Sequence, residues 1–273
     1  MKMKKPPTFS PPLEGGRLRG GETSVSFEVF KRRKALNMFF VGGFPDIEKT
    51  SELLKLLPKL GCDIVEVGVP YSDPLADGSV IRTSYSAALA RGITLDGILK
   101  TIKAVRKDVP VPIVLLIYEN LIMKKGEDVF IREMAECGVN GVIVPDLLFP
   151  FSNVFADKCR DAAIAFIPLV SPKTSLARVE KISERGGGFL YYVNVEGVTG
   201  ERRKLPENIK AQLKKIKSSS KLPVLSGFGI SRPSHIKSIK KYVDGVIIGS
   251  ALQKRINAGQ KIEGFVREMR CSL

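Results

Sequence analysis

Histidine and cysteine are the scarce residues of this 273-residue sequence. It holds one histidine, His235, so Ser-His-Asp or Cys-His catalysis would depend on that residue alone. His235 lies in "SRPSHIKS", which has the composition of a solvent-facing helix start, so we expect a surface or structural histidine rather than a catalytic one. The four cysteines, Cys62, Cys137, Cys159 and Cys271, are far apart and show no C-x-x-C spacing. Metal sites and disulfides are therefore not expected.

Long apolar segments are also missing. No run approaches the roughly 20 apolar residues that cross a bilayer, so no membrane span is predicted. The first residues, "MKMKKPPTFSPPLEGG", lack the apolar stretch of a secretion signal, and we expect a cytoplasmic protein. Residues 1–25 are rich in Pro, Gly and charge without periodicity, which predicts a disordered N-terminal extension ahead of one catalytic domain at 26–273.

The charge is unbalanced toward the positive side, with 44 Lys and Arg against 28 Asp and Glu and a formal net charge of +16. The basic residues are spread through helical patterns such as "IKAQLKKIKSSSK" and do not form one stripe with interleaved aromatics. This distribution favours solvated helix faces over a nucleic-acid surface. The excess could also steer an anionic small molecule toward a cleft.

Eight short apolar segments alternate with amphipathic helical ones over the rest of the chain. The strands are predicted at 37–43, 63–69, 112–118, 140–146, 165–170, 189–195, 222–229 and 243–250. Each is rich in Val, Ile and Leu, as strands buried on both faces are. Eight strand–helix units without a domain break predict a single (β/α)8 TIM barrel, with an open doubly wound sheet carrying an inserted lobe as the alternative.

Glycine-rich loops follow three consecutive strands near the C-terminus. They are "GVTG" (197–200), "SGFGIS" (226–231) and "IIGSAL" (247–252). Any one of them could be a tight turn. In a barrel, however, such loops lie together at the active-site end, where backbone N–H groups and a helix N-terminus can hold a phosphate. We therefore expect an anionic, phosphorylated ligand.

An acidic residue interrupts the second strand. In "DIVEVGV" the side chain of Glu66 alternates with those of Val65, Val67 and Val69, which suit a helix-packing face, so Glu66 should point into the barrel. A buried carboxyl either pairs with a distant Lys or Arg, or its pKa rises toward the range of acid–base catalysis. Both readings are open from the residues alone.

Two aspartates follow in the loop after this strand. Asp73 in "SDP" and Asp77 in "ADG" both match turn signatures, in which an aspartate bonds to its own backbone. Taken alone, each is predicted to be a turn residue.

Four motifs together resemble the tryptophan synthase alpha chain family. They are "VEVGVPYSDPLADG", "YYVNVEGVTG", "SGFGIS" and "DGVIIGSAL", in that order, and the likeness runs from about Phe27 to near the C-terminus. The resemblance implies a retro-aldol lyase that cleaves indole-3-glycerol phosphate to indole and glyceraldehyde 3-phosphate. It also implies no metal or cofactor in this chain. The partner would be a pyridoxal-phosphate-dependent beta chain in an alpha2beta2 heterotetramer.

The resemblance also assigns roles to residues. Glu66 would be the catalytic acid–base, and Asp77 would accept the indole N–H. The remaining positions fall into three groups. The indole pocket and lid would comprise Phe39, Leu116, Ile143, Leu169, Tyr191 and Thr199. The phosphate would bind to Gly200, Phe228, Gly229, Gly249 and Ser250. The beta chain would contact Pro70, Asp73, Pro74, Asn120 and Asp146.

Several residues depart from the family pattern. Val195 stands where an arginine is usual, and Arg82 stands where a glutamine is usual. Neither change removes a catalytic group, but both affect the expected lid and its signalling. Two alternatives to the main hypothesis therefore stay open: a stand-alone indole-3-glycerol phosphate lyase, and a weakly active allosteric subunit that mainly activates a beta chain.

Overall fold

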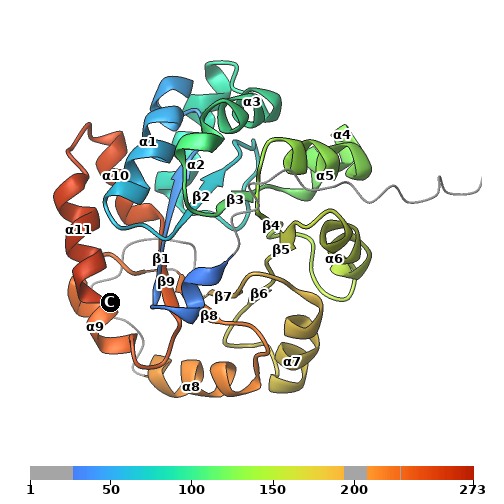
Figure 1. The fold of residues 1–273 in the computed structure, drawn as a ribbon, viewed down its shortest axis with the longest axis vertical. Coiled ribbons are helices and arrows are strands. Elements are labelled where there is room, and N and C mark those ends of the chain that lie inside the picture. Colours follow the sequence, from blue (N-terminus) through green and yellow to red (C-terminus); the bar gives the residue numbers. More distant parts are fainter. Residues whose placement is uncertain (1–26, 194–207, 228) are drawn as a thin grey trace, which may run out of the picture.

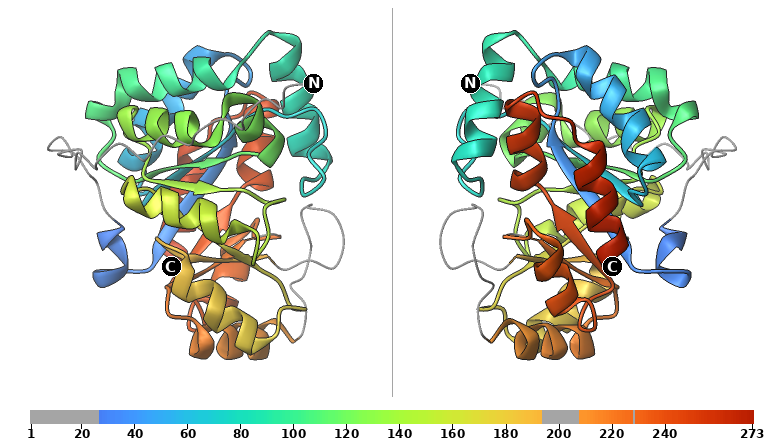
Figure 2. Two further views of the ribbon diagram at one scale, coloured as in Figure 1. Left: turned by 90° about the vertical axis from the view of Figure 1, so that its right-hand side faces the viewer. Right: turned by 90° about the vertical axis from the view of Figure 1, so that its left-hand side faces the viewer.

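A computed structural model of the chain describes residues 27–193, 208–227 and 229–273. The predicted extension at 1–25 and most of the predicted loop after 193 lie outside the described residues. Within them, parallel strands form a central barrel and helices surround it (Figures 1 and 2).

The strands run in one direction and all pair in parallel. Their bounds are β1 Ala35–Val41, β2 Ile64–Gly68, β3 Ile113–Leu116, β4 Gly141–Ile143, β5 Ala165–Phe166, β6 Leu169–Val170, β7 Leu190–Val193, β8 Val224–Gly227 and β9 Gly245–Ile248. The order around the sheet is β5-β4-β3-β2-β1-β9-β8-β7-β6.

The sheet closes through a single chain segment. Its two end strands, β5 and β6, are halves of the predicted strand 165–170, separated only by Ile167 and Pro168. The backbone carbonyl of Pro168 accepts a hydrogen bond from Tyr191 N, while Ile167 N bonds to Val142 O on the other side. Pro168 has no N–H to contribute, which explains why the ladder is interrupted there. The closed barrel of eight strand segments is confirmed, and the open-sheet alternative is wrong.

Helices cover the outside of the barrel. Their bounds are α1 Ile47–Lys59, α2 Ser79–Ala90, α3 Leu95–Val105, α4 Glu119–Lys125, α5 Glu127–Glu136, α6 Ser152–Asp161, α7 Leu176–Arg185, α8 Ile209–Ser219, α9 Pro233–Ile239, α10 Ser250–Asn257 and α11 Glu263–Ser272, with short 3-10 turns at Glu28–Lys31 and Arg106–Asp108. Local sequence explains several starts. The Asp46 side chain accepts a hydrogen bond from Lys49 N, and Thr94 accepts one from Gly97 N, both as N-caps.

Side-chain alternation divides the core into two clusters. Val65, Val67 and Val69 pack outward against the helices, whereas Ile64 belongs with Phe39 to the cluster inside the barrel. The predicted facing of this strand is therefore confirmed. Cys62, Cys137 and Cys159 are buried free thiols and Cys271 is exposed, so none of the four forms a disulfide.

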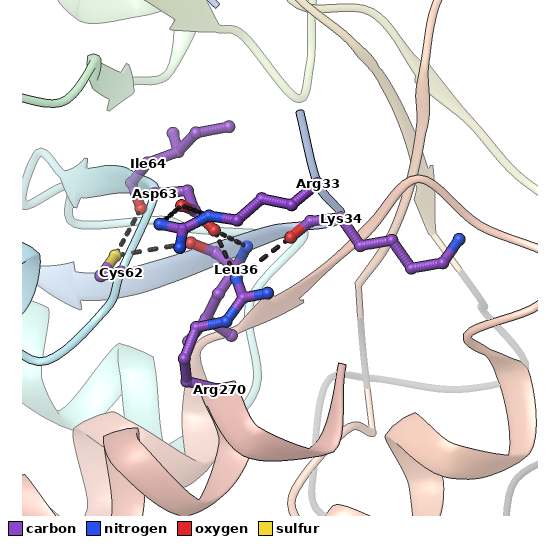
Figure 3. Close-up of polar contacts among 7 residues, drawn as sticks. All are labelled: Arg33, Lys34, Leu36, Cys62, Asp63, Ile64 and Arg270. Carbon is purple, nitrogen blue, oxygen red and sulfur yellow. Dashed lines mark hydrogen bonds and ion pairs between the residues drawn. The ribbon is translucent and has the colours of Figure 1, made fainter. Parts of the chain in front are cut away.

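A charged cluster ties the C-terminal helix to the end of the barrel where β1 and β2 begin (Figure 3). Asp63, directly before β2, is almost fully buried and accepts hydrogen bonds from Arg33 at 2.5 Å, Arg270 of α11 at 2.6 Å and Leu36 N at 2.8 Å. Arg270 also donates to Lys34 O. The cluster lies before the strands, at the end of the barrel opposite the loops that follow them, which makes it a structural feature.

Candidate active site

A cavity lies at the end of the barrel where the strands finish. Its lining residues come from six strands and from the loops and helix starts that follow them: Phe39, Glu66, Asp77, Ile81, Leu116, Tyr191, Gly229, Ile230, Ser231, Ile247, Gly249, Ser250 and Ala251. It brings together both carboxyl groups, part of the predicted indole pocket and part of the predicted phosphate site.

Glu66 is fully buried at the inner face of β2. Asn37 Nδ2 of β1 donates a hydrogen bond of 2.7 Å to Glu66 Oε2, and Oε1 has no hydrogen-bond partner among the described residues. Burial in this setting raises the pKa of Glu66 to about 8, with the nearby charge of Asp77 adding to the rise and the Asn37 bond opposing it. The alternative of pairing with a Lys or Arg is not what the structure shows, since the side chain that bonds to Glu66 is the amide of Asn37.

Asp77 is nearly buried in the loop after β2. Tyr118 donates its hydroxyl proton to Asp77 Oδ2 at 2.6 Å, and the same hydroxyl accepts a bond from Ala76 N. Burial raises the pKa of Asp77 to about 6, while the Tyr118 bond and the charge of Arg82 lower it. Arg82, in the first turn of α2, therefore favours the ionised form of Asp77, which gives this unusual residue a physical role.

The carboxyl groups of Glu66 and Asp77 therefore differ in pKa. With pKa values of about 8 and about 6, Glu66 is mainly protonated and Asp77 mainly ionised at pH 7. A neutral acid beside a carboxylate is the arrangement that assigns two acidic groups to different tasks in one site.

Aromatic side chains pack tightly around this pair. A Cβ added to Gly68 would lie 2.6 Å from both Phe39 Cζ and Tyr85 Oη, and one added to Gly227 would lie 2.7 Å from Tyr191 Oη. These two glycines therefore leave room for the rings inside the barrel. Burial, and the negative charge of Glu66 and Asp77, raise the pKa of both Tyr85 and Tyr191, so both phenols stay neutral.

The predicted indole-pocket residues lie in three places. Phe39, Leu116 and Tyr191 line the cavity, and Leu169 lines an adjoining one together with Asp77 and Tyr191. Ile143 is fully buried inside the barrel and lines neither cavity. Thr199 lies outside the described residues, as does Val195.

The predicted phosphate residues lie on two neighbouring loops. Gly229 has a φ of +77°, and Gly249 and Ser250 form the start of α10 beside Phe39. Gly200 and Phe228 lie outside the described residues. Of the two alternatives for His235, a surface or a structural histidine, the surface one is wrong. His235 is buried, and its Nδ1 lies 3.0 Å from Gly229 O, because the first turn of α9 folds back on this loop.

The predicted partner residues lie around the loop after β2. Asp73 is exposed and bonds to Ser72, whereas Pro70 and Pro74 are buried. Asn120 is exposed and donates to Tyr71 Oη, and the exposed Asp146 accepts from Glu119 N. The Tyr71 ring stacks on Tyr118 with centroids 4.9 Å apart, so this surface is joined by contacts to Asp77.

Asn37, Tyr85 and Tyr118 are site residues that the sequence analysis missed. Tyr118 contacts Asp77 across 41 positions of sequence, and only the fold reveals such a contact. Asn37 had a detectable signal, since it is a polar residue within an apolar strand.

Over 27–193, 208–227 and 229–273, no group of three His, Cys, Asp or Glu side chains is placed to hold a metal. None of the helices described there has the length and apolar character needed to cross a membrane.

A closed parallel barrel with two buried carboxyl groups in a cavity at the end where the strands finish has the architecture of a barrel enzyme. The family model "Tryptophan synthase alpha chain" matches residues 28–272, and the chain belongs to this family.

Individual members of the family are similar to this chain over most of its length. The chain is 41% identical over 237 residues to the tryptophan synthase alpha chain of Petrotoga mobilis, covering 87% of this chain and 92% of that one. It is 39% identical over 253 residues to that of a Thermoanaerobacter species, covering 89% and 96%. Among solved structures, tryptophan synthase from Mycobacterium tuberculosis matches with a TM-score of 0.83 and 30% identity, covering 91% and 98%. The alpha chain of Legionella pneumophila matches with a TM-score of 0.81 and 33% identity, covering 90% and 94%.

Proposed function

We propose that Glu66 and Asp77 are the groups with which this chain performs the reaction of its family. That reaction is the retro-aldol cleavage of indole-3-glycerol phosphate to indole and glyceraldehyde 3-phosphate. The chain is a lyase of tryptophan biosynthesis, the alpha subunit of tryptophan synthase. The observation that supports the roles most strongly is that two buried carboxyl groups of different acidity line one cavity.

The chemistry follows from the two protonation states. Neutral Glu66 donates its proton to C3 of the indole ring, and ionised Asp77 accepts a hydrogen bond from the ring N–H, which stabilises the positive charge that forms. The carboxylate of Glu66 then takes the proton of the adjacent side-chain hydroxyl. The C–C bond breaks, its electron pair returns to the ring, and the hydroxyl carbon becomes the aldehyde of the product. Glu66 ends protonated, so no net proton is consumed.

The rest of the cavity suits the two ends of the substrate. Phe39, Leu116, Leu169 and Tyr191 offer an apolar surface for the indole ring, and Ile143 supports it from within the barrel. The phosphate would bind to backbone N–H groups around Gly229, Gly249 and Ser250. On the resemblance alone, we propose that Thr199 belongs to the lid. On the same ground we propose that Gly200 and Phe228 contact the phosphate.

We also propose a partner and a location for this protein. Tryptophan synthase complexes are among the similar structures, which supports a beta chain as partner, and we place its contact at Pro70, Asp73, Pro74, Asn120 and Asp146 in an alpha2beta2 heterotetramer. The pyridoxal phosphate would belong to that partner, and this chain would need no cofactor. We place the protein in the cytoplasm, with residues 26–273 as the catalytic domain and 1–25 as an extension.

The Asp77→Asn variant tests the proposed roles. With the matched beta chain present, indole release from indole-3-glycerol phosphate should fall about 100-fold or more, since aligned electrostatic groups contribute factors of that order. Asp108→Asn is the matched control, because Asp108 is exposed and precedes β3 at the opposite end of the barrel. Equal activity of the two variants would contradict the role of Asp77. Omitting the beta chain separates a stand-alone lyase from a partner-dependent one.

A further inference from the structure

Asn37 is a polar side chain in an apolar place. It lies in the middle of β1, fully buried, and pairs in register with Ile64 of β2 and Ile247 of β9. Its Oδ1 has no hydrogen-bond partner among the described residues. A buried amide with an unsatisfied carbonyl is a cost to folding that an apolar residue of similar size would avoid. Asn37 therefore calls for an explanation other than packing.

The pairing register between β1 and β2 explains why Asn37 lies within reach of Glu66. Phe39 pairs with Glu66, and Asn37 pairs with Ile64, so Asn37 lies one step deeper in the barrel than Glu66 on the same inward face. From there its Nδ2 donates the 2.7 Å bond to Glu66 Oε2. The other oxygen, Oε1, is left without a partner in the described part of the chain.

This contact distinguishes the two oxygens of Glu66. In a neutral carboxyl group the carbonyl oxygen accepts hydrogen bonds more strongly than the hydroxyl oxygen does, so the N–H of Asn37 favours the form in which Oε2 is the carbonyl oxygen and Oε1 carries the proton. We propose that Asn37 is a positioning residue that holds the transferable proton of Glu66 on Oε1 and keeps the carboxyl group aligned in both protonation states. When the proton leaves, the same N–H stabilises the carboxylate. This proposal rests on the proposed function of Glu66 as the acid–base.

Other groups near Glu66 do not replace this contact. The titratable neighbours whose charges couple to it are Asp77, in the loop after β2, and the phenols of Tyr85 and Tyr191. Asp77 is already engaged by Tyr118. Among the described residues, the hydrogen-bond donor to Glu66 is the amide of Asn37.

Asn37→Leu tests the proposal by removing the amide at similar volume. The Glu66 carboxyl would be titrated by carbon-13 NMR in glutamate-labelled protein, with Glu66→Gln used to assign its signal. Loss of the donor should raise the pKa of Glu66 above the value in the unchanged chain, because the bond favours the ionised form. In indole release with the beta chain, kcat should fall about 10- to 100-fold with KM changed less than about twofold, as misplacement of a catalytic group by about 1 Å costs about 100-fold.

Controls separate this role from a structural one. Gln253→Leu removes another fully buried amide, which bonds to Val41 N and Ser84 rather than to Glu66. It should lower the melting temperature without moving the Glu66 titration. If Asn37→Leu does not fold, Asn37→Ala removes the N–H without adding a charge, and the same rise is expected. An unshifted Glu66 titration in a folded Asn37 variant would overturn the proposal. Absence of indole release by the unchanged chain would instead overturn the proposed function.

Discussion

Removing the hydroxyl of Tyr118 should move the acidic limb of the pH–rate profile. This hydroxyl donates a 2.6 Å hydrogen bond to Asp77, which favours the ionised carboxylate. A hydrogen bond to a charged group contributes about 1.5–3 kcal/mol, and one pKa unit corresponds to about 1.4 kcal/mol. In Tyr118→Phe the pKa of Asp77 should therefore rise by about one to two units from its value of about 6.

This rise in the pKa of Asp77 should strongly lower its ionised fraction at neutral pH. An acid with a pKa near 6 is about nine-tenths ionised at pH 7, but an acid with a pKa of 7 to 8 is at most about half ionised. Because kcat/KM reports the free enzyme, its profile should rise through the pKa of Asp77 and fall through that of Glu66. In the unchanged chain these limbs should lie near pH 6 and pH 8.

The assay is indole release from indole-3-glycerol phosphate between pH 5 and 9 with the beta chain present. Tyr192→Phe is the matched control, because Tyr192 donates its hydroxyl to Gln212 on the outer side of the barrel. It should leave both limbs in place. An acidic limb that stays near pH 6 in Tyr118→Phe would refute the reasoning about Asp77.

Two further predictions concern stability. Because burial raises the pKa of Glu66 from 4.5 to about 8, the folded state binds a proton that the unfolded state releases, so this residue costs stability increasingly from about pH 4.5 to 8. Glu66→Gln should match the unchanged chain at pH 4.5 and exceed it at pH 8.5 by on the order of 4 kcal/mol, measured by urea unfolding, and a constant difference across this range would contradict the burial argument. Asp63→Asn should lower the free energy of unfolding by about 2 kcal/mol, since Asp63 accepts bonds from Arg33 and Arg270, whereas the exposed Asp96→Asn should change it little. Equal melting curves for the two aspartate variants would contradict a structural role for the charged cluster.

Much of the fold could be predicted because each strand carried its own apolar pattern. Glu66 was assigned to the inner face by alternation alone, and the structure agrees. The strand at 165–170 could be found but not its division at Pro168, which depends on how the two halves pair with different neighbours.

The site was less accessible to sequence reasoning. Asp77 matches a turn signature, and its burial depends on Tyr118, which follows a different strand. His235 was expected to be a surface or a structural histidine, and its polar neighbours in the sequence gave no sign that it is buried with Nδ1 3.0 Å from Gly229 O. The bond from Asn37 to Glu66 depends on the register between β1 and β2, which pairs residues from segments far apart in the sequence.

The most direct test of the central claim is indole release by Glu66→Gln with the matched beta chain. Glutamine keeps the size of the side chain and its bond to Asn37 but cannot transfer a proton, so cleavage should fall about 100- to 10,000-fold, the usual contribution of acid–base catalysis, while phosphate binding persists. Glu180→Gln, an exposed position on α7, should retain full activity. Glu66→Gln with most of the activity intact would show that another group carries the proton.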